Sequence, residues 1–536
     1  MKKLNNSRVI CLSIGVLLLI SVCNLSCKKQ KSEDYNAINT RDKRVATWTA
    51  PDQYVFCVAA DWDYIESDVK TQFGSSVNKS VAIGVCPMFY IFERSAATIE
   101  AELREHLRLA ELHEVPILIQ FDPYTFTDAR PDLWNWWDSG MTGYNVNNKD
   151  NVEWTGWTNA DAVKIGWLNW GSQTRLKPMM NLASTAYKSA VTTDMTTLID
   201  IVKDWYDDLP TSQKWLFAGI KVTPEVWLGV NNWYYTNGNS YLSSSPSGDP
   251  TTGVVDTIRP SRGVQTIGYA GVKTAGIRTS GTITGDDISE LARQFCLFTA
   301  QLCSSRGIAR DHIFTHAGGG TVAKDLEACI NDYACPSWSF YVANPSQYSQ
   351  ALAALSLSDA PYFGISEWAS GSSTASDWTH SIEDGFCINK CRYLSVFTNV
   401  VGNSSTPANS VAIAGIKGIQ ATVVLTTEQT LSSGITVSSP NGNYTMTNQT
   451  DGNLVVYNGS TPVWSSGTSG QGASTLKMQN DGNLVLYKNG AGPTWSSGTY
   501  QGGSADYYLV LNNSGTLVLY AGSPGIGSKR ILWRSN

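Results

Sequence analysis

The chain has 536 residues, a formal net charge of −6 at pH 7 and only 16% charged residues. This composition excludes a protein that binds nucleic acid through a basic surface, because no basic excess is available to neutralise phosphates. Hydrophobic residues make up 42% of the chain, so general disorder is excluded as well. The 19 tryptophans and 24 tyrosines are unusual. Flat aromatic faces with polar edges favour the stacking of sugar rings, and the alternative is that they fill a large core.

The N-terminus has the layout of a secretion signal. Basic residues precede an apolar stretch at 9–22 that is too short to span a membrane comfortably, and a hydrophilic run follows. The pattern resembles a bacterial lipoprotein leader, which ends on a small residue followed by the cysteine that is lipidated. Ser26-Cys27 fits this ending, whereas Asn24 departs from the usual aliphatic residue.

This resemblance implies a signal peptide over 1–27, lipidation of Cys27 and a polar tether over 28–48. The protein is then expected in the cell envelope, held by its lipid anchor in the periplasm or at the outer-membrane surface. An uncleaved anchor or an ordinary secretion signal is the alternative. Each of these places the bulk of the chain outside the cytoplasm.

Eight cysteines lie beyond this leader. Cys387 with Cys391 and Cys329 with Cys335 are candidate disulfide pairs, although a helical i,i+4 spacing is poor for a disulfide. None of the five histidines accompanies these pairs at ligand spacing. Neither a metal site nor a cofactor is therefore predicted.

Short apolar runs alternate with helical periods between residues 49 and 420, which is typical of βα units. Eight strands are predicted, at 53–60, 81–86, 116–121, 217–222, 311–316, 336–340, 361–366 and 393–398. Helices are predicted at 97–113, 185–207, 287–305, 322–331, 346–356, 376–390 and 408–419. This count indicates an α/β fold, a (β/α)8 TIM barrel. An open doubly wound sheet is the alternative, but no glycine-rich phosphate loop follows the first strand.

Two glutamates follow predicted strands on the face where TIM barrels carry their chemistry. Glu225 follows the fourth strand and Glu367 follows the seventh, and these strands lie across the barrel mouth from each other. Paired carboxyl groups about 5–5.5 Å apart can act as nucleophile and acid/base in retaining glycoside hydrolysis, and about 6.5–9.5 Å leaves room for an attacking water. The alternative for each glutamate is a solvated loop carboxylate.

Residues 49–420 resemble the clan A type of retaining glycoside hydrolases, which carry catalytic glutamates at strand ends four and seven. The resemblance rests on Glu225 in FAGIKVTPEVW and on Glu367 in PYFGISEW. It implies that Glu225 is the acid/base and that Glu367 is the nucleophile. Pro224 stands where many members have asparagine, and the eighth strand lacks the frequent tryptophan.

Other polar and aromatic residues at strand ends and on long insertions are expected to bind substrate. They are Asp61, Trp62, Asp122, Tyr124, Trp154, Asn169, Arg175, His316, Trp338, Tyr341 and Trp368. Seven tryptophans lie between 134 and 170 on the insertion after strand three, and a second insertion at 230–285 is expected to wall the same mouth. The alternatives are that the insertion aromatics form the core of a lid, that Asp122 serves a turn, and that His316 is structural.

A repeated motif marks a separate domain at 421–536, where charged residues become sparse. Gln449-Thr-Asp451-Gly-Asn453-Leu-Val455-Val-Tyr457 recurs after 30 residues, and a degenerate third copy spans 512–520. Each copy is followed by a tryptophan, and these three rings are expected to meet in a shared core of a three-fold β-prism. Alternation along each copy predicts that Gln, Asp, Asn and Tyr share one strand face, where they can bind sugar hydroxyls.

The motif resembles that of bulb-type mannose-binding lectins, Gln-x-Asp-x-Asn-x-Val-x-Tyr. The resemblance implies two mannose sites, made by Gln449, Asp451, Asn453 and Tyr457 and by Gln479, Asp481, Asn483 and Tyr487. The third copy has lost Gln, Asp and Asn, so its site is predicted to be dead or altered. The alternative is a β-prism kept as a structural or protein-binding module.

These observations together favour an extracytoplasmic glycoside hydrolase that acts on a poly- or oligosaccharide and carries a mannose-type lectin module. Its expected partners are glycans and, through the lipid anchor, a membrane. The alternative is a glycan-binding lipoprotein without catalytic activity, and an inverting or non-hydrolytic barrel enzyme is a third possibility.

Overall fold

The computed structural model describes residues 51–535 except 78, 80, 170–172, 227, 229, 232–264, 319–322, 403–406, 526 and 528. Residues Thr49–Asn536 form one compact unit. The predicted signal peptide, Cys27 and the tether lie outside the described residues. Within the described ranges, no helix has the length and apolar character needed to cross a membrane.

Eight parallel strands close into a barrel, in the order β1-β12-β11-β10-β9-β6-β3-β2. They are β1 (Gln53–Ala60), β2 (Val81–Tyr90), β3 (Ile117–Asp122), β6 (Phe217–Lys221), β9 (Ile313–Ala317), β10 (Cys335–Phe340), β11 (Phe363–Trp368) and β12 (Cys391–Val396). Each barrel strand pairs with the barrel strands that precede and follow it along the chain, and the first strand, β1, also pairs with the last, β12, which closes the barrel. The predicted barrel is therefore confirmed, and the open sheet is excluded.

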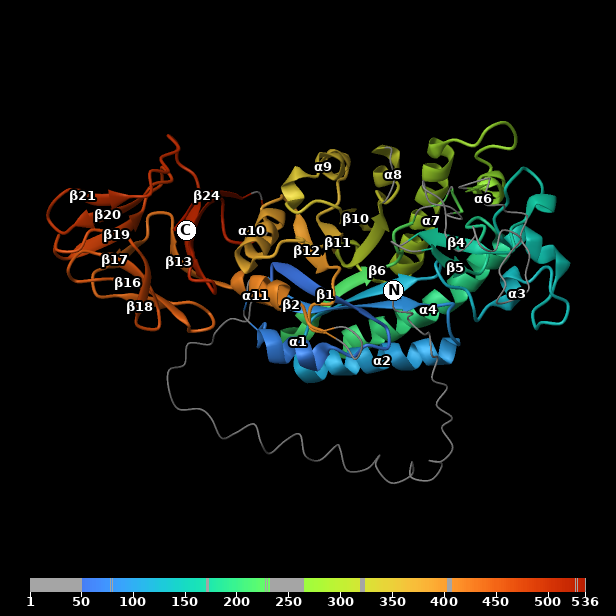
Figure 1. The fold of residues 1–536 in the computed structure, drawn as a ribbon, viewed down its shortest axis with the longest axis horizontal. Coiled ribbons are helices and arrows are strands. Elements are labelled where there is room, and N and C mark those ends of the chain that lie inside the picture. The colour runs from blue at the N-terminus through green and yellow to red at the C-terminus, as the bar shows by residue number, and fades with distance from the viewer. Residues whose placement is uncertain are drawn as a thin grey trace, which may run out of the picture. The chain divides into compact units, whose positions relative to one another are not determined.

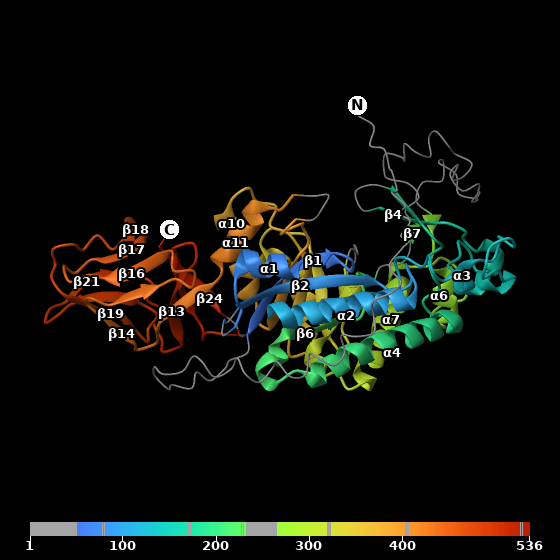
Figure 2. The ribbon, with the colours of Figure 1, turned by 90° about the horizontal axis from the view of Figure 1, so that it is seen from below.

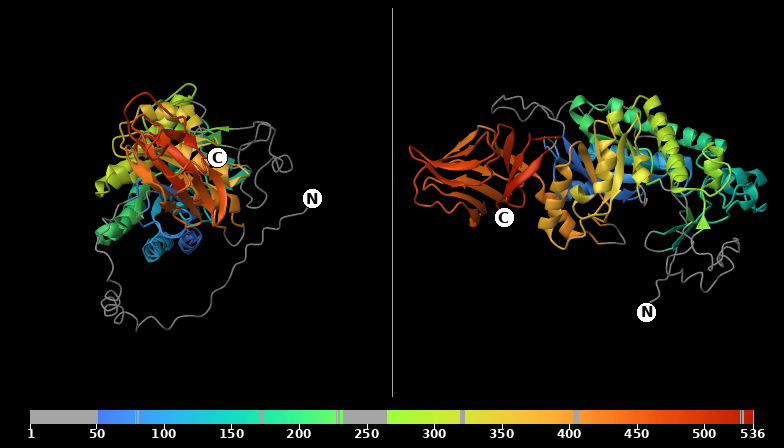
Figure 3. Two further views of the ribbon diagram at one scale, coloured as in Figure 1. Left: turned by 90° about the vertical axis from the view of Figure 1, so that its left-hand side faces the viewer. Right: turned by 90° about the horizontal axis from the view of Figure 1, so that it is seen from above.

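Helices cover the outside of the barrel (Figures 1, 2 and 3). They are α1 (Glu66–Phe73), α2 (Ala96–His113), α4 (Thr185–Asp208), α7 (Gly285–Ser305), α8 (Ala323–Glu327), α9 (Ser349–Ser356), α10 (Ala375–Phe386) and α11 (Ser410–Gly418). Seven of these match predicted helices, whereas α1 was not predicted. Its sequence ESDVKTQF buries only Glu66, Val69 and Phe73, so its apolar periodicity is weak.

Aromatic rings fill the lower barrel interior. The Tyr393 ring contacts Phe56 and Phe314 edge-on, at ring-centroid distances of 5.9 and 4.9 Å. A Cβ at Gly364 would lie 2.1 Å from this ring, so glycine is needed there. Above the ring, the Ser366 hydroxyl lies 2.8 Å from the Tyr393 hydroxyl and donates to Ser337 over 2.7 Å. The floor beneath the barrel mouth is therefore packed and hydrogen-bonded.

Short elements decorate the insertions after β3 and β6. They are α3 (Pro131–Trp134), the 3-10 helices at Val146–Asn151 and Asn159–Asp161, the hairpin β4 (Gly166–Asn169) and β5 (Gln173–Leu176), the pair β7 (Val230–Asn231) and β8 (Gln265–Thr266), and α6 (Tyr269–Thr274). Further 3-10 turns lie at Thr211–Leu216, Arg310–His312 and Pro345–Gln347.

Beyond the barrel, twelve strands form three antiparallel sheets of four strands each (orange to red in Figure 1). The first sheet joins β13 (Ala421–Thr426), β22 (Tyr507–Asn512), β23 (Leu517–Ala521) and β24 (Arg530–Arg534). The second joins β14 (Thr430–Ser432), β19 (Ser474–Met478), β20 (Leu484–Lys488) and β21 (Pro493–Ser496). The third joins β15 (Thr436–Ser438), β16 (Tyr444–Asn448), β17 (Leu454–Asn458) and β18 (Thr461–Ser465).

One tryptophan from each sheet reaches a common centre. Trp464, Trp495 and Trp533 contact one another edge-on, with ring centroids 5.6–5.8 Å apart. The predicted meeting of the three rings is confirmed. Because residues 49–536 form one compact unit, the expected domain boundary near residue 421 stays a prediction.

The third repeat contacts the barrel through buried polar groups. Arg534 of β24 pairs with Glu383 of α10 at 2.7 Å, and Asn512 Nδ2 donates to the same carboxyl over 3.4 Å. The Asn513 backbone N–H donates to the Gln420 carbonyl over 2.8 Å. The third repeat is thus an attachment surface.

All eight cysteines of the described part are free thiols, and seven of them are buried. The candidate disulfides at Cys387–Cys391 and Cys329–Cys335 are therefore not formed. Burial raises the pKa of the Cys57 thiol to about 12, which keeps it protonated. These cysteines serve as small core residues.

Candidate functional site

The two predicted glutamates lie at the mouth of the barrel. Glu225 follows β6, the fourth barrel strand in chain order, and Glu367 lies near the end of β11, the seventh. Both side chains are partly buried. The order of strands along the chain therefore brings the two predicted carboxyl groups to the same end of the barrel.

Ser339, which was not among the predicted site residues, lies beside the two glutamates. Ser339 lies on β10, where it pairs directly with Glu367 in the strand register. Its side chain lies close enough to lower the pKa of both Glu225 and Glu367.

Tyr341 and Gly318 fix the Glu225 carboxyl group. The Tyr341 hydroxyl donates to Oε1 over 2.8 Å and lies 3.1 Å from Oε2. A Cβ at Gly318, just after β9, would lie 2.5 Å from Oε1 of Glu225. Glycine at this position therefore leaves the space that the carboxyl group occupies.

A buried lysine lies beneath the pair. Lys221, the last residue of β6, is fully buried and donates to Oε1 of Gln120 on β3. Burial lowers the pKa of Lys221, whereas the charges of Cys86, Glu367, Glu225 and Asp122 raise it. The sequence does carry a signal for this lysine. A charged residue at an inward-facing position of an apolar strand such as FAGIK needs a polar partner inside the barrel.

The carboxyl groups of the pair have raised pKa values. Burial and then the charge of Glu225 raise the pKa of Glu367 to about 7, against lowering by Lys221 and Ser339. Burial also raises the pKa of Glu225, whereas Tyr341, Ser339 and Lys221 lower it. A carboxyl group that stays protonated near neutral pH can serve as a general acid.

His316 supports this site from β9. Its Nε2 lies 3.0 Å from the Ser339 hydroxyl, and its backbone N–H donates to the Thr223 hydroxyl over 2.9 Å. Burial, with a smaller effect of Lys221, lowers the pKa of His316 well below its usual range. His316 is therefore a neutral residue that orients Ser339, and it does not reach the mouth surface.

Asp122 and Tyr124 lie beside the pair. Oδ1 of Asp122 accepts the backbone N–H groups of Tyr124 and Thr125, each over 2.8 Å, which is the turn role given as its alternative. Both residues are buried, and burial, followed by the charges of Asp122, Glu153 and Glu225, raises the pKa of Tyr124. Asp122 thus shapes the turn and adds negative charge near the glutamates.

Asp61 and Trp62 follow β1 at the same end of the barrel. Asp61 is buried against Arg94, and burial raises its pKa to about 6. The Trp62 ring is 49% exposed, and the Arg94 guanidinium lies 5.1 Å from its centre. Trp62 is thus an accessible aromatic face, whereas Asp61 is held in an ion pair.

Three predicted substrate-binding tryptophans are instead core residues. Trp338 is fully buried and its indole N–H donates to the Leu326 carbonyl, because alternate residues of β10 face the helices. The Trp368 indole N–H donates to Val342, and its ring contacts Trp378 at 5.4 Å. Trp154 is buried and donates to Lys149. The structure thus gives all three rings a place in the core, and their role in substrate binding stays a prediction.

The other tryptophans of the first insertion behave similarly. Trp134 and Trp137 contact each other at 5.6 Å, and the indole N–H groups of Trp134, Trp136 and Trp157 all donate to backbone carbonyls. Glu153 accepts the backbone N–H groups of Ala270 and Gly271 and thereby ties this insertion to α6. The described aromatics of the insertion therefore form a core, as the alternative held.

Asn169 and Arg175 belong to the β4–β5 hairpin, in which Trp167 pairs with Arg175 and Asn169 with Gln173. Their side chains lie outside the described part. Most of the second insertion, 232–264, is also outside it, so its expected place at the mouth stays a prediction.

In the first two repeats, the motif residues form hairpins with matching contacts. Gln449 Nε2 donates to the Tyr457 hydroxyl over 2.6 Å, and Gln479 Nε2 donates to Tyr487 over 2.8 Å. The Asp451 carboxylate accepts the Asn453 N–H over 2.9 Å. Asp481 accepts the Asn483 N–H in the same way, over 3.0 Å.

The motif was expected to form one extended strand, but it forms a turn followed by a strand. Gly452 in the turn has a φ of 92°, and a Cβ there would lie 2.3 Å from the Gly472 carbonyl oxygen. The Asp-Gly pair makes this tight turn possible. The turn still brings Gln449 and Tyr457 together.

In the third repeat, the corresponding positions are Asn512, Ser514, Thr516 and Tyr520. All of them except Ser514 are buried, and Asn512 contacts Glu383 of the barrel. The repeat that has lost the motif residues is thus the one that contacts the barrel.

No protein-family model and no curated protein matches the chain. Some solved structures align with part of it. A monomeric mannose-binding lectin from Gastrodia elata is 34% identical, with 21% of this chain and 94% of the lectin covered and a TM-score of 0.19. The mannose-specific agglutinin of snowdrop, Galanthus nivalis, is 34% identical, with 18% and 89% covered and a TM-score of 0.18. A lectin from Allium sativum is 31% identical, with 18% and 93% covered and a TM-score of 0.17.

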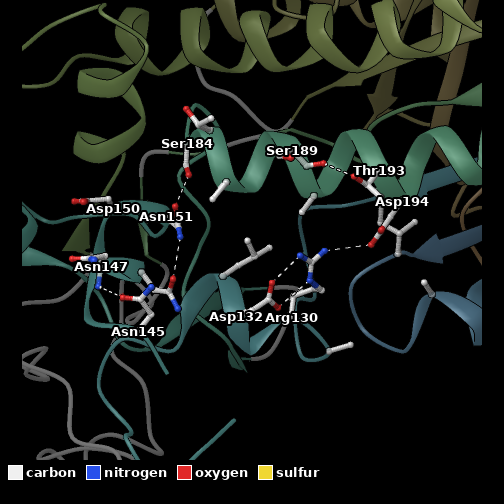
Figure 4. A pocket seen from close by; sticks show the side chains of 18 of the residues that line it. Arg130, Asp132, Asn145, Asn147, Asp150, Asn151, Ser184, Ser189, Thr193 and Asp194 are labelled. Atoms are coloured by element: carbon white, nitrogen blue, oxygen red, sulfur yellow. Dashed lines mark hydrogen bonds and ion pairs between the residues drawn. The ribbon is translucent and has the colours of Figure 1, made fainter. Parts of the chain in front are cut away.

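Across the described residues, no group of three or more His, Cys, Asp or Glu side chains is placed to hold a metal ion. A depression of about 1050 Å³ lies between the start of α4 and the segment 129–151 (Figure 4). In it, Arg130 is paired with Asp132 and Asp194. Neither Glu225 nor Glu367 lines this depression, so the candidate site is defined by the carboxyl pair.

Proposed function

We propose that this chain is a glycoside hydrolase whose catalytic pair is Glu225 and Glu367. The observation that carries the proposal is the placement of both carboxyl groups at one end of a closed parallel barrel, beside Ser339 of β10. The raised pKa values of both groups support a pair in which one carboxyl group holds a proton while the other is ionised.

The retaining mechanism is proposed from the resemblance to clan A glycoside hydrolases. It requires the two carboxyl groups to lie about 5–5.5 Å apart, because one of them attacks the sugar directly.

We also propose that the three sheets form a β-prism lectin module with two mannose-type sites. Among the hydrogen bonds of the described residues, Gln449 Oε1 and Asn453 Nδ2 have no protein partner, and the same is true of Gln479 and Asn483. These groups are available to sugar hydroxyls, with Val455 and Val485 lining the sites.

The leader supports a further proposal, that Cys27 is lipidated and holds the protein in the cell envelope. Cys27→Ala should move the protein from the membrane fraction of cells to the soluble fraction. The matched control is Cys23→Ala, which should leave the membrane association intact. Membrane association that persists in Cys27→Ala would contradict lipidation at this residue.

The hydrolase proposal is tested by the release of reducing sugar from a panel of polysaccharides and aryl glycosides. Glu225→Gln and Glu367→Gln should each lower turnover at least about 1000-fold on natural glycans. Glu111→Gln, at an exposed position on α2, is the matched control and should be unchanged. Glycan binding without release by the wild-type chain would instead support a non-catalytic glycan-binding protein.

A further inference from the structure

We propose that the depression beside α4 is a second glycan-binding site, which holds a neutral stretch of polysaccharide away from the carboxyl pair. Its volume is about 1050 Å³, at the upper end of the roughly 300–1,000 Å³ that is common for ligand pockets. This is space for several linked sugar units. Because holding a glycan needs no bond cleavage, the inference goes beyond the proposed hydrolase function.

The depression lies at the same end of the barrel as the carboxyl pair. One wall is the start of α2, which follows β2, and another is the segment 129–151, which follows β3. The third wall is the start of α4, which ends the same insertion (Figure 4). These segments all follow the C-terminal ends of parallel strands, where Glu225 and Glu367 also lie. A polysaccharide held in the depression therefore stays at the end of the barrel where the proposed cleavage takes place.

Short polar side chains and alanines line the depression. Exposed members of this lining are Asn145, Asn147, Thr185, Ser189, Ala96, Ala129 and Ala186. A sugar unit presents hydroxyl groups at its edge and C–H groups on its faces, so amide and hydroxyl side chains suit the edge and methyl groups suit the faces. The lining thus matches both parts of a sugar unit.

The same lining disfavours a peptide or a lipid as the ligand. Its two larger aliphatic residues, Ile91 and Leu133, are buried. Peptides are held chiefly by large apolar or aromatic anchors, and the described lining presents no exposed side chain of that kind. The chemistry of the depression therefore favours a glycan.

Several lining groups are available to bind sugar hydroxyls. Among the hydrogen bonds of the described residues, no protein partner is found for four side-chain groups, which are the amide of Asn147, Nδ2 of Asn145 and the hydroxyl groups of Thr185 and Ser189. Amides and hydroxyls can both donate and accept, as sugar hydroxyls do. These four groups supply the direct contacts of the proposed site.

The charges of the depression are already paired, which favours a neutral ligand. Arg130 pairs with Asp132 over 2.8 Å and with Asp194 over 3.4 Å, and both partners line the depression (Figure 4). Arg94 is paired with the buried Asp61. An acidic polysaccharide would have to break one of these ion pairs to bind an arginine, so a neutral glycan is expected.

Hydrogen bonds hold one wall in place before a ligand arrives. The Ser184 hydroxyl at the start of α4 donates to Asn151 Oδ1 over 2.6 Å, and Asn151 Nδ2 donates to Asn148 Oδ1 over 3.2 Å. Asn148 Nδ2 in turn donates to the carbonyl oxygens of Asn135 and Gly143, each over 3.2 Å. A wall that is already ordered lowers the entropy cost of binding.

Affinity electrophoresis of the full chain tests this site without turnover. Each native gel contains one polysaccharide, a β-glucan, a xylan, a galactan, a mannan or the acidic polygalacturonate, with methyl α-mannoside in excess to occupy the proposed lectin sites. We expect at least one neutral polysaccharide to retard the wild-type chain. An absence of retardation by all neutral polysaccharides, or retardation by polygalacturonate alone, would overturn the inference.

The Ser189→Trp variant locates the retardation. Its indole would fill part of the depression, so the apparent dissociation constant for the retarding polysaccharide should rise at least about fivefold. Thr197→Trp is the matched control, at another exposed position about 12 Å further along α4 and outside the lining, and it should behave as the wild type. Equal retardation of the two variants would overturn the inference.

The Asn147→Ala variant covers the case in which the large indole disturbs the fold. The Asn147 side chain makes no hydrogen bond within the described residues, so its loss should leave the melting temperature unchanged. Loss of its contact with sugar should raise the dissociation constant about two- to tenfold. An unchanged dissociation constant would contradict the assigned contacts.

Turnover of aryl glycosides separates this inference from the proposed function. These small substrates do not reach the depression, so Ser189→Trp should cleave them as the wild type does. Cleavage of aryl glycosides without retardation by any neutral polysaccharide would contradict the second site alone. Retardation that Ser189→Trp abolishes, together with no cleavage by the wild type, would contradict the hydrolase proposal alone.

Discussion

Glu367 makes the stability of the protein depend on pH. Its pKa is raised from 4.5 to about 7, so the folded state keeps a proton that the unfolded chain has already released over this range. The contribution is therefore fully present below pH 4.5 and is lost as the pH rises through about 7.

Glu367→Gln should remove this dependence. Its amide cannot ionise, so the variant should gain stability relative to the wild type by roughly 3 kcal/mol between pH 4.5 and pH 8. Urea unfolding at several pH values measures the difference, with Glu111→Gln as the control. A difference that stays constant with pH would contradict the raised pKa.

Gly318→Ala should disturb the site without unfolding the barrel. The added methyl group would lie 2.5 Å from Oε1 of Glu225 and 3.4 Å from Cβ of Ser339. Because Glu225 must shift away from Tyr341, kcat on aryl glycosides should fall at least about tenfold, with a stability change of about 1–3 kcal/mol.

Gly140→Ala is the control for this substitution, since the nearest atom to its new methyl group is 3.4 Å away. It should change neither kcat nor the melting temperature appreciably. Wild-type kcat in Gly318→Ala would mean that Glu225 tolerates displacement and would count against its catalytic role.

The sequence identified both glutamates because strand ends can be located from apolar runs, but the direction of each neighbouring side chain was harder to infer. Trp338 and Trp368 were selected as aromatic residues near strand ends, although alternation turns them toward the helices. Ser339 was overlooked because serine in a strand carries no distinctive signal. Its role depends on which residues the closed barrel brings next to it.

At the scale of the elements, strands and long helices were predictable because their apolar periodicity reflects burial on a defined face. The barrel strands begin and end within about two residues of prediction, except that β2 continues to Tyr90. The β4–β5 hairpin escaped prediction, because GWLN and QTRL are short and carry no clear alternation.

The lectin hairpins give an element-scale prediction. Asp451→Ala and Asp481→Ala each remove a carboxylate that holds a motif turn, so each should weaken binding of methyl α-mannoside. The double variant should show no binding by calorimetry, with the barrel still folded. Ser514→Ala, the corresponding change in the third repeat, is the matched control. Unchanged affinity in the double variant would favour a structural role for the repeats.

At the scale of the whole molecule, Glu383 and Arg534 join the barrel to the third repeat. Glu383→Ala removes the partner of a largely buried arginine, so the free energy of unfolding should fall by about 2–3 kcal/mol. Urea denaturation measures this loss, and Asp200→Ala in the exposed Arg306 pair is the control, with an expected loss of at most about 1 kcal/mol. Equal effects of the two variants would contradict a stabilising attachment.

In the proposed lectin module, the use of the third repeat for attachment leaves two mannose-type sites. Two sites on one module can both bind a surface that displays many mannose residues. Once the first site is occupied, the effective concentration of mannose at the second site is raised. Weak individual sites can therefore give long residence on such a surface, while a single soluble sugar is released quickly. Avidity of this kind would keep the barrel close to densely glycosylated material, whereas isolated sugars would occupy the lectin sites only briefly.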